Sequence, residues 1–205
     1  MNDLITFGIS VFAGFFAVMN PIGDIPVFLS LVPSATHQEK KQISKKAAIV
    51  AFIVGFLFIV FGKYLFHLFG ITLSAFKIAG GFLLFYIGFE MLQSKETSVG
   101  HIKNTKINEN IAITPLAIPI ITGPGTIVTG MNYVAHASNT KVFLTVSIFA
   151  FMCFLNYLAF VLGDLLLKKI GTNAIAALEK IMGLIIAVIG TNMIIDGIKI
   201  SFNLI

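Results

Sequence analysis

Residues 111–140 read IAITPLAIPIITGPGTIVTGMNYVAHASNT and contain no Asp, Glu, Lys or Arg. Residues 142–163 also lack these four residue types. A helix needs about 20 apolar residues to cross the hydrocarbon core of a bilayer, and both stretches are long enough. They therefore predict membrane-spanning helices.

The composition of the whole chain also indicates a membrane protein. Of its 205 residues, 57% are hydrophobic and 11% are charged, whereas a soluble domain carries about 25% charged residues. The net charge of +5 comes from 14 lysines, because the chain has no arginine. These lysines lie between apolar segments, so we interpret them as orientation signals and expect no nucleic-acid partner.

The apolar pattern predicts an all-α integral membrane protein, in contact with the lipid bilayer through six transmembrane helices. The predicted spans are 4–32, 47–69, 74–92, 111–135, 141–166 and 176–198. The N-terminus lacks the basic region and cleavage site of a secretory signal peptide, so we expect the first span to be retained. The polar stretch 93–110 predicts a cytoplasmic loop between two halves.

The distribution of lysines predicts the orientation. Six spans put both termini on one side, and lysines accumulate in cytoplasmic loops. Four lysines fall on the side of the termini, namely Lys63, Lys77, Lys141 and Lys199. Ten fall on the other side, namely Lys40, Lys41, Lys45, Lys46, Lys95, Lys103, Lys106, Lys168, Lys169 and Lys180. We therefore expect both termini on the outer, periplasmic side.

An internal repeat appears when the sequence is shifted by 102 residues. The identical pairs include Ala75/Ala177, Gly81/Gly183, Ile87/Ile189, Gly88/Gly190, Met91/Met193 and Gly23/Gly125. Each half, 1–92 and 111–205, holds three spans, so two such halves lie inverted relative to each other within a single membrane domain, 1–205. Inverted repeats are common in secondary transporters, which bind solute near the midplane between the halves.

Proline and glycine predict that the first and fourth helices are interrupted. Pro21, Gly23 and Pro26 fall within six residues of the first helix, and Pro115, Pro119 and Pro124 interrupt the fourth helix. Proline removes a backbone donor and clashes with the preceding turn. Backbone groups freed at this depth must face protein or a water-filled cavity. We therefore expect both breaks to face the interior.

The polar residues at these breaks predict a solute-binding site. Its members are Asn20, Pro21, Gly23, Asp24, Thr122, Gly123, Pro124, Gly125 and Thr126. Exposed backbone groups and helix termini attract charged solute groups. Asp24 is the only acid near a break, and it lies either in the site or in a hydrated vestibule on the cytoplasmic side.

Other polar and small residues have structural interpretations. We expect Asn156 to hydrogen-bond another helix, with a place in the solute site as the alternative, and Cys153 to be a buried apolar residue. Lys77, Glu90, Asp164, Glu179 and Asp196 lie near helix ends, where they snorkel or pair. Gly80, Gly81, Gly88, Gly183 and Gly190 allow close helix packing.

The segments 20–29 (NPIGDIPVFL) and 115–127 (PLAIPIITGPGTI) resemble the MarC family of bacterial inner-membrane proteins, the UPF0056 group. The resemblance covers nearly the whole chain. It implies a multi-pass protein of the bacterial inner membrane. It also implies a transporter, importing or exporting small neutral amino acids such as glycine or alanine. For such a transporter, H⁺ and Na⁺ are the candidate coupling ions, and the sequence does not select between them.

Two other classes of function have less support in the sequence. An enzyme is not expected, because His37, His67, His101 and His136 fall in loops or near helix ends and no HExxH motif occurs. Neither a metal ligand set nor an ATP-binding loop (GxxxxGK[ST]) is found, so we expect no cofactor and no catalytic residue. A passive channel or a non-transporting structural protein remains the alternative.

Overall fold

The computed structural model describes residues 2–93, 112–135 and 137–202. Within these ranges the chain is helical and contains no strand, as the sequence predicts. The elements are α1 (Asn2–Met19), α2 (Asp24–Leu31), α3 (His37–Phe69), α4 (Leu73–Gln93), the π-helix η2 (Ile113–Ile121), α5 (Pro124–Val134), α6 (Asn139–Val161), α7 (Gly163–Ile170) and α8 (Thr172–Ser201). Of the predicted loop 93–110, only Gln93 is among the described residues.

Four of the described helices are long and apolar enough to cross a membrane. Their spanning segments are His37–Gly62, Ser74–Gln93, Asn139–Val161 and Asn173–Ser201, in α3, α4, α6 and α8. The predicted spans 4–32 and 111–135 are instead each divided into two shorter helices, α1 with α2 and η2 with α5. We call these four short helices the interrupted helices.

Two predicted boundaries are wrong, for identifiable reasons. Helix α3 begins at His37, before the predicted start at residue 47, because Thr36 and Glu39 form a capping box. Such a box satisfies two free donors at a helix start and so extends the helix beyond its apolar part. The predicted span 141–166 is divided at Leu162, where α6 ends and α7 begins.

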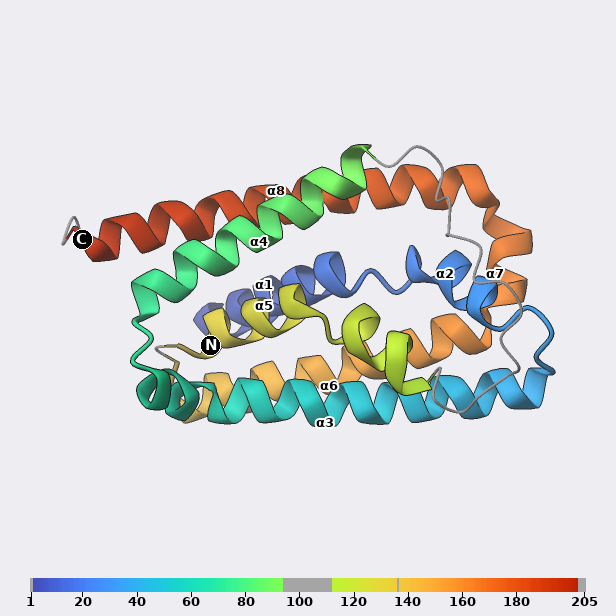
Figure 1. Ribbon diagram of the computed structural model, residues 1–205, viewed down its shortest axis with the longest axis horizontal. Helices are drawn as coiled ribbons and strands as arrows, with labels where there is room; N and C mark the ends of the chain where they lie inside the picture. Colours follow the sequence, from blue (N-terminus) through green and yellow to red (C-terminus); the bar gives the residue numbers. More distant parts are fainter. Residues whose placement is uncertain (1, 94–111, 136, 203–205) are drawn as a thin grey trace.

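The helices form three layers (Figure 1). In this view α4 and α8 lie along one edge and α3 and α6 along the other, with α1, α2, η2 and α5 between them. The first and last described residues lie at the same end of the molecule. The interrupted helices are therefore enclosed between two pairs of long, continuous helices.

The pair formed by α4 and α8, which we call the glycine-packed pair, touches backbone to backbone. A Cβ atom added to Gly81 would lie 2.6 Å from the Gly190 carbonyl oxygen. One added to Gly183 would lie 2.9 Å from the carbonyl oxygen of Gly88. The predicted role of these four glycines in close packing is confirmed, because a larger side chain would strike backbone.

Aromatic rings join the middle layer to α6. The ring of Phe15 on α1 lies 5.3 Å from that of Phe149, and Phe28 on α2 stacks on Phe160 at 4.6 Å. All four side chains are buried. Because Phe15 precedes the first interruption and Phe28 follows it, α6 holds the helices on both sides of that break.

The outer surface of the bundle carries many large apolar side chains. Examples are Phe82, Phe85 and Tyr86 on α4 and Leu184 and Val188 on α8, all of them exposed. Soluble monomers rarely expose contiguous apolar patches of this kind. This surface fits contact with lipid tails.

Candidate functional site

The first interruption depends on the backbone of Asn20. This residue has a positive φ of 37°, a conformation that asparagine adopts more readily than most other residues. Its N–H donates to the Phe16 carbonyl (3.0 Å), and its Oδ1 accepts a hydrogen bond from the Gly23 N–H (3.3 Å). Pro21 follows and has no N–H with which to continue the helix. Asn20 therefore ends α1 and fixes the turn that follows.

The other predicted residues of this break lie in the turn and at the start of α2. Pro21 and Gly23 are buried, and Asp24 is half-buried. Asp24 is the first residue of α2, and its N–H donates to the Asn20 carbonyl (3.1 Å). A carboxylate at a helix N-terminus is favourable because it faces the positive end of the helix dipole. Asp24 thus suits the start of α2.

The second interruption follows a π-helix. Pro115 and Pro119 within η2 lack the N–H that an α-helical ladder uses. The Thr122 N–H donates to the Ala117 carbonyl (2.9 Å), five residues earlier, which closes the wider turn. π-Helical turns are rare and occur frequently at functional sites.

Two threonine hydroxyls hold this second break in place. The Thr122 hydroxyl donates to the Ala51 carbonyl on α3 (2.9 Å). The Thr126 hydroxyl reaches back across the break to the Ile121 carbonyl (3.1 Å). Both side chains are buried, so part of the backbone freed by the break is satisfied by protein.

Helix α5 begins inside the bundle at the second break. Gly123 is extended (φ −79°, ψ 174°) and precedes Pro124, the first residue of α5, a position where proline is favoured. No described side chain caps this end. The first N–H groups of a helix have no partner within it, so this buried end offers donors and a partial positive charge.

The two breaks are neighbours in the fold. A Cβ atom added to Gly125 would lie 3.1 Å from Cγ1 of Val18, two residues before Asn20. Helix α1 runs toward the middle of the bundle and α5 runs away from it (Figure 1). The C-terminus of α1 therefore lies beside the N-terminus of α5, which brings partial charges of opposite sign together.

The interior also contains polar residues outside the predicted set. Asn156 on α6 and Thr129 on α5 are buried. The Asn156 Oδ1 and the Thr129 hydroxyl have no hydrogen-bond partner among the described residues. Asn156 was expected to bond another helix, but its amide donates to the Met152 carbonyl of its own helix (3.1 Å). Thr129 follows Thr126 by one turn, a spacing that could have suggested it.

Charged side chains pair away from the breaks, as expected for Asp164, Lys77 and Asp196. Lys40 Nζ on α3 lies 2.7 Å from Asp164 Oδ2 on α7. Lys77 pairs with Asp196 between α4 and α8 at 3.4 Å. These pairs link helices, and no predicted site residue takes part in them.

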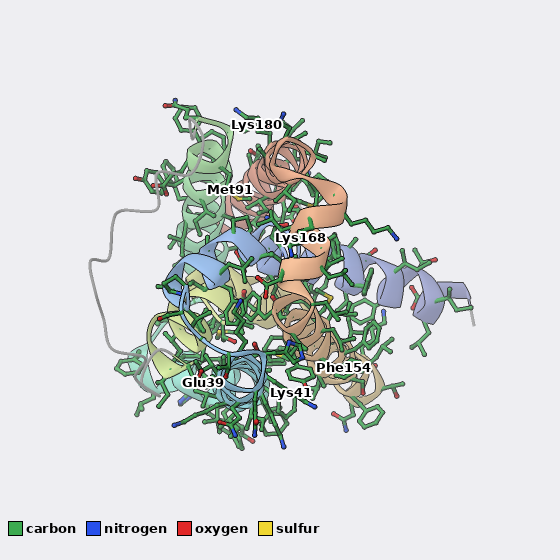
Figure 2. All side chains as sticks on the ribbon, turned by 90° about the vertical axis from the view of Figure 1, so that its right-hand side faces the viewer. Glu39, Lys41, Met91, Phe154, Lys168 and Lys180 are labelled. Atoms are coloured by element: carbon green, nitrogen blue, oxygen red, sulfur yellow. The ribbon has the colours of Figure 1, made fainter. Side chains whose placement is uncertain are left out.

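Lysines from three helices gather at one end of the bundle (Figure 2). Lys41 on α3, Lys168 on α7 and Lys180 on α8 all appear at the end that faces the viewer. The starts of α4 and α6 lie at the opposite end, and these starts carry Lys77 and Lys141.

A surface groove of about 350 Å³ lies apart from the breaks. Its lining residues are Lys41, Lys45, Ala48, Ile49, Phe154 and Tyr157. None of the predicted site residues lines it. The buried polar groups at the two breaks, and not this groove, therefore define the candidate site.

Comparison with known proteins agrees with a membrane-embedded protein. The model of the MarC family, described as integral membrane proteins, matches residues 5–202. The UPF0056 membrane protein YvbG of Bacillus subtilis is 38% identical over 205 residues, covering 97% of each chain.

Relatives occur in archaea as well as bacteria. The UPF0056 membrane protein PH0760 of Pyrococcus horikoshii is 37% identical over 95% of each chain. A UPF0056 membrane protein of Buchnera aphidicola is 35% identical over 96% of each chain. No solved structure matches the chain. With a family match over nearly its whole length, the chain is an integral membrane protein of the MarC family.

Proposed function

We propose that this protein is a secondary transporter of small neutral amino acids, such as glycine or alanine, and that it binds the solute at its two breaks. The observation that carries the proposal is the apposition of the α1 C-terminus and the α5 N-terminus inside an apolar bundle. Gly125 packs on Val18 at this point, and Asn20, Thr122 and Thr126 are buried around it.

This apposition suits a zwitterion. The carbonyl end of α1 carries partial negative charge and favours an ammonium group, while the N–H end of α5 favours a carboxylate. A glycine molecule carries both groups one carbon apart. The predicted site residues Pro21, Gly23, Asp24, Gly123 and Pro124 form the backbone that creates these two ends.

The proposed architecture is six transmembrane helices in two inverted repeats, 1–92 and 111–205. In it α1–α2 and η2–α5 are the two interrupted spans. The contacts of the glycine-packed pair support this symmetry. The 102-residue shift converts the contact between Gly81 and Gly190 into one between Gly183 and Gly88, and both contacts occur.

Two repeats of opposite orientation allow two related conformations, one open to each side of the membrane. Transport would follow from rocking one repeat against the other, driven by an H⁺ or Na⁺ gradient. We propose that the lysine-rich end faces the cytoplasm, since lysines accumulate there. In this orientation both termini are periplasmic in the bacterial inner membrane.

Uptake by purified protein in proteoliposomes tests the proposal. Labelled glycine and alanine are supplied under an imposed proton or sodium gradient. We expect gradient-dependent accumulation, reduced in Asn20→Ala, Pro124→Ala and Gly125→Leu. Ser147→Ala is the matched control, because the Ser147 hydroxyl is exposed and bonds only its own helix.

Each negative outcome has a distinct meaning. Absence of uptake under every gradient would reject this substrate class. Wild-type uptake in all three variants, at normal protein levels, would move the site away from the breaks. Ohmic currents without accumulation would indicate the alternative function, a passive channel.

A further inference from the structure

Asn156 on α6 presents a buried acceptor that the described part of the chain leaves unused. The residue is fully buried. Its Nδ2 donates to the Met152 carbonyl (3.1 Å), whereas its Oδ1 has no donor partner among the described residues. Buried polar atoms are nearly always hydrogen-bonded, so this oxygen calls for an explanation.

The orientation of this amide follows from hydrogen-bond chemistry. The two ends of an asparagine amide are assigned from their partners. The partner here is the Met152 carbonyl, which only accepts. The NH₂ group must therefore face Met152, and the oxygen is the end of the amide left without a partner among the described residues.

Ring contacts place Asn156 opposite the first break. On α6, Phe149 precedes Asn156 by seven residues and Phe160 follows it by four, spacings that put all three on one helix face. Phe149 contacts Phe15, before the break, and Phe160 contacts Phe28, after it. Asn156 therefore faces the segment between them, where Asn20 ends α1.

The end of α1 favours a positively charged donor for the Asn156 oxygen. The C-terminus of α1 points its last carbonyl groups toward the break and carries partial negative charge. A cationic donor is stabilised there by both the α1 dipole and the amide oxygen. A carboxylate is disfavoured at this end and belongs at the α5 N-terminus.

We propose that the Asn156 Oδ1 accepts a hydrogen bond from the ammonium group of the transported solute. The inference rests on the proposed transport function and deepens it. Asn156 then selects solutes that carry an ammonium group over carboxylates of equal size that lack one. Propionate is the matched probe, because it is glycine with the ammonium group replaced by a methyl group.

Three variants distinguish a role of the Asn156 oxygen as hydrogen-bond acceptor from a structural role of this side chain. Asn156→Leu removes both polar atoms and keeps the branched shape of the side chain. Asn156→Thr keeps the bond to the helix, since threonine hydroxyls already bond the carbonyl four residues earlier at Thr145 and Thr191, but it withdraws the amide oxygen. Thr145→Val is the control, a buried polar side chain on the same helix.

The experiment measures labelled glycine uptake in proteoliposomes and its inhibition by unlabelled glycine and by propionate. We expect wild-type protein and Thr145→Val to prefer glycine. The ratio of the two inhibitory concentrations should fall about tenfold or more in Asn156→Leu and Asn156→Thr, as for a lost charge-assisted hydrogen bond. Asn156→Asp keeps an acceptor and should retain the preference.

The experiment measures a selectivity ratio because a purely structural role of Asn156 would lower uptake but leave the ratio unchanged. An unchanged ratio in Asn156→Thr, with wild-type glycine uptake intact, would overturn this inference alone and assign the oxygen to bound water. If the wild-type protein takes up no glycine, the proposed function and the inference both fail. Should Asn156→Leu not fold, the ratio in Asn156→Thr still decides the outcome.

Discussion

The glycine-packed pair and the interrupted helices lie in the same apolar environment but differ in backbone continuity and in buried polar residues. Helices α4 and α8 are continuous and meet through glycines. Among the described residues, every buried polar side chain lies outside these two helices. The two breaks carry the buried residues Asn20 and Thr122, and α5 carries Thr126 and Thr129.

This difference indicates that the two regions have different roles. A continuous helix satisfies its own backbone, so two such helices associate by close packing alone. A break frees backbone groups that need partners, and here side chains such as Thr122 supply some of them. The glycine-packed pair can therefore serve as a frame, while the interrupted helices carry the groups able to bind a polar solute.

The largest expected loss of stability comes from disrupting the contact between α4 and α8. In Gly190→Leu the new side chain would start 2.5 Å from the Gly81 carbonyl oxygen and the Phe85 nitrogen, both backbone atoms that cannot move aside. We expect a loss of stability of about 3 kcal/mol or more, measured as the melting temperature and monodisperse yield in detergent. Ala79→Leu, at an exposed position of α4, should behave as wild type. Wild-type stability in Gly190→Leu would mean that the helices do not meet here.

The next effect concerns the backbone of the first break. Asn20→Ala forces alanine into a positive φ and removes the acceptor for the Gly23 N–H, so we expect a loss of about 2 kcal/mol. Asn20→Gly removes only the acceptor and should lose about 1 kcal/mol. Thermal unfolding of both variants measures the difference. Equal stability of the two would show that the conformation of Asn20 is unstrained.

A smaller effect tests the hydrogen bond that joins the second break to α3. Thr122→Val removes the hydrogen bond to the Ala51 carbonyl and should cost about 1 kcal/mol. Thr145→Val is the matched comparison, because the Thr145 hydroxyl bonds only its own helix, an arrangement that adds little stability. If denaturation midpoints show equal losses, the inter-helix bond has no special role.

The smallest effect compares an ion pair within the glycine-packed pair with an ion pair outside it, between α3 and α7. Asp164→Asn breaks the 2.7 Å pair with Lys40, and Asp196→Asn breaks the 3.4 Å pair with Lys77 in the glycine-packed pair. Both acids are more than half exposed, so each loss should stay below about 1 kcal/mol. We expect the larger loss in Asp164→Asn, shrinking at high salt. A larger loss in Asp196→Asn would reverse the order.

Much of this arrangement was predictable from local patterns. Apolar length identified α3, α4, α6 and α8, and prolines identified where the other two spans are interrupted. Glycines at a regular spacing indicated close packing, and Gly81, Gly88, Gly183 and Gly190 provide it. These features succeed because each depends on a residue's own backbone and on hydrophobicity.

Features that depend on distant residues were not predictable. The π form of η2 and the bond from Thr122 to Ala51, 71 residues away, have no local signature. Asn156 bonds Met152 on its own helix and not another helix as predicted, and what its side chain faces depends on the register of α6 against α1 and α2. Ring contacts at Phe149 and Phe160 set that register.

The sequence by itself determined a membrane-embedded helical protein with two interruptions. Hydrophobicity and the missing N–H groups of proline are local properties that do not depend on tertiary contacts. Only the tertiary structure decided that the end of α1 lies beside the start of α5, because helices so far apart in sequence meet through packing. Tertiary packing also buried Asn156 and left its oxygen without a partner among the described residues. The polar groups of the candidate site come from the sequence, and their convergence comes from the fold.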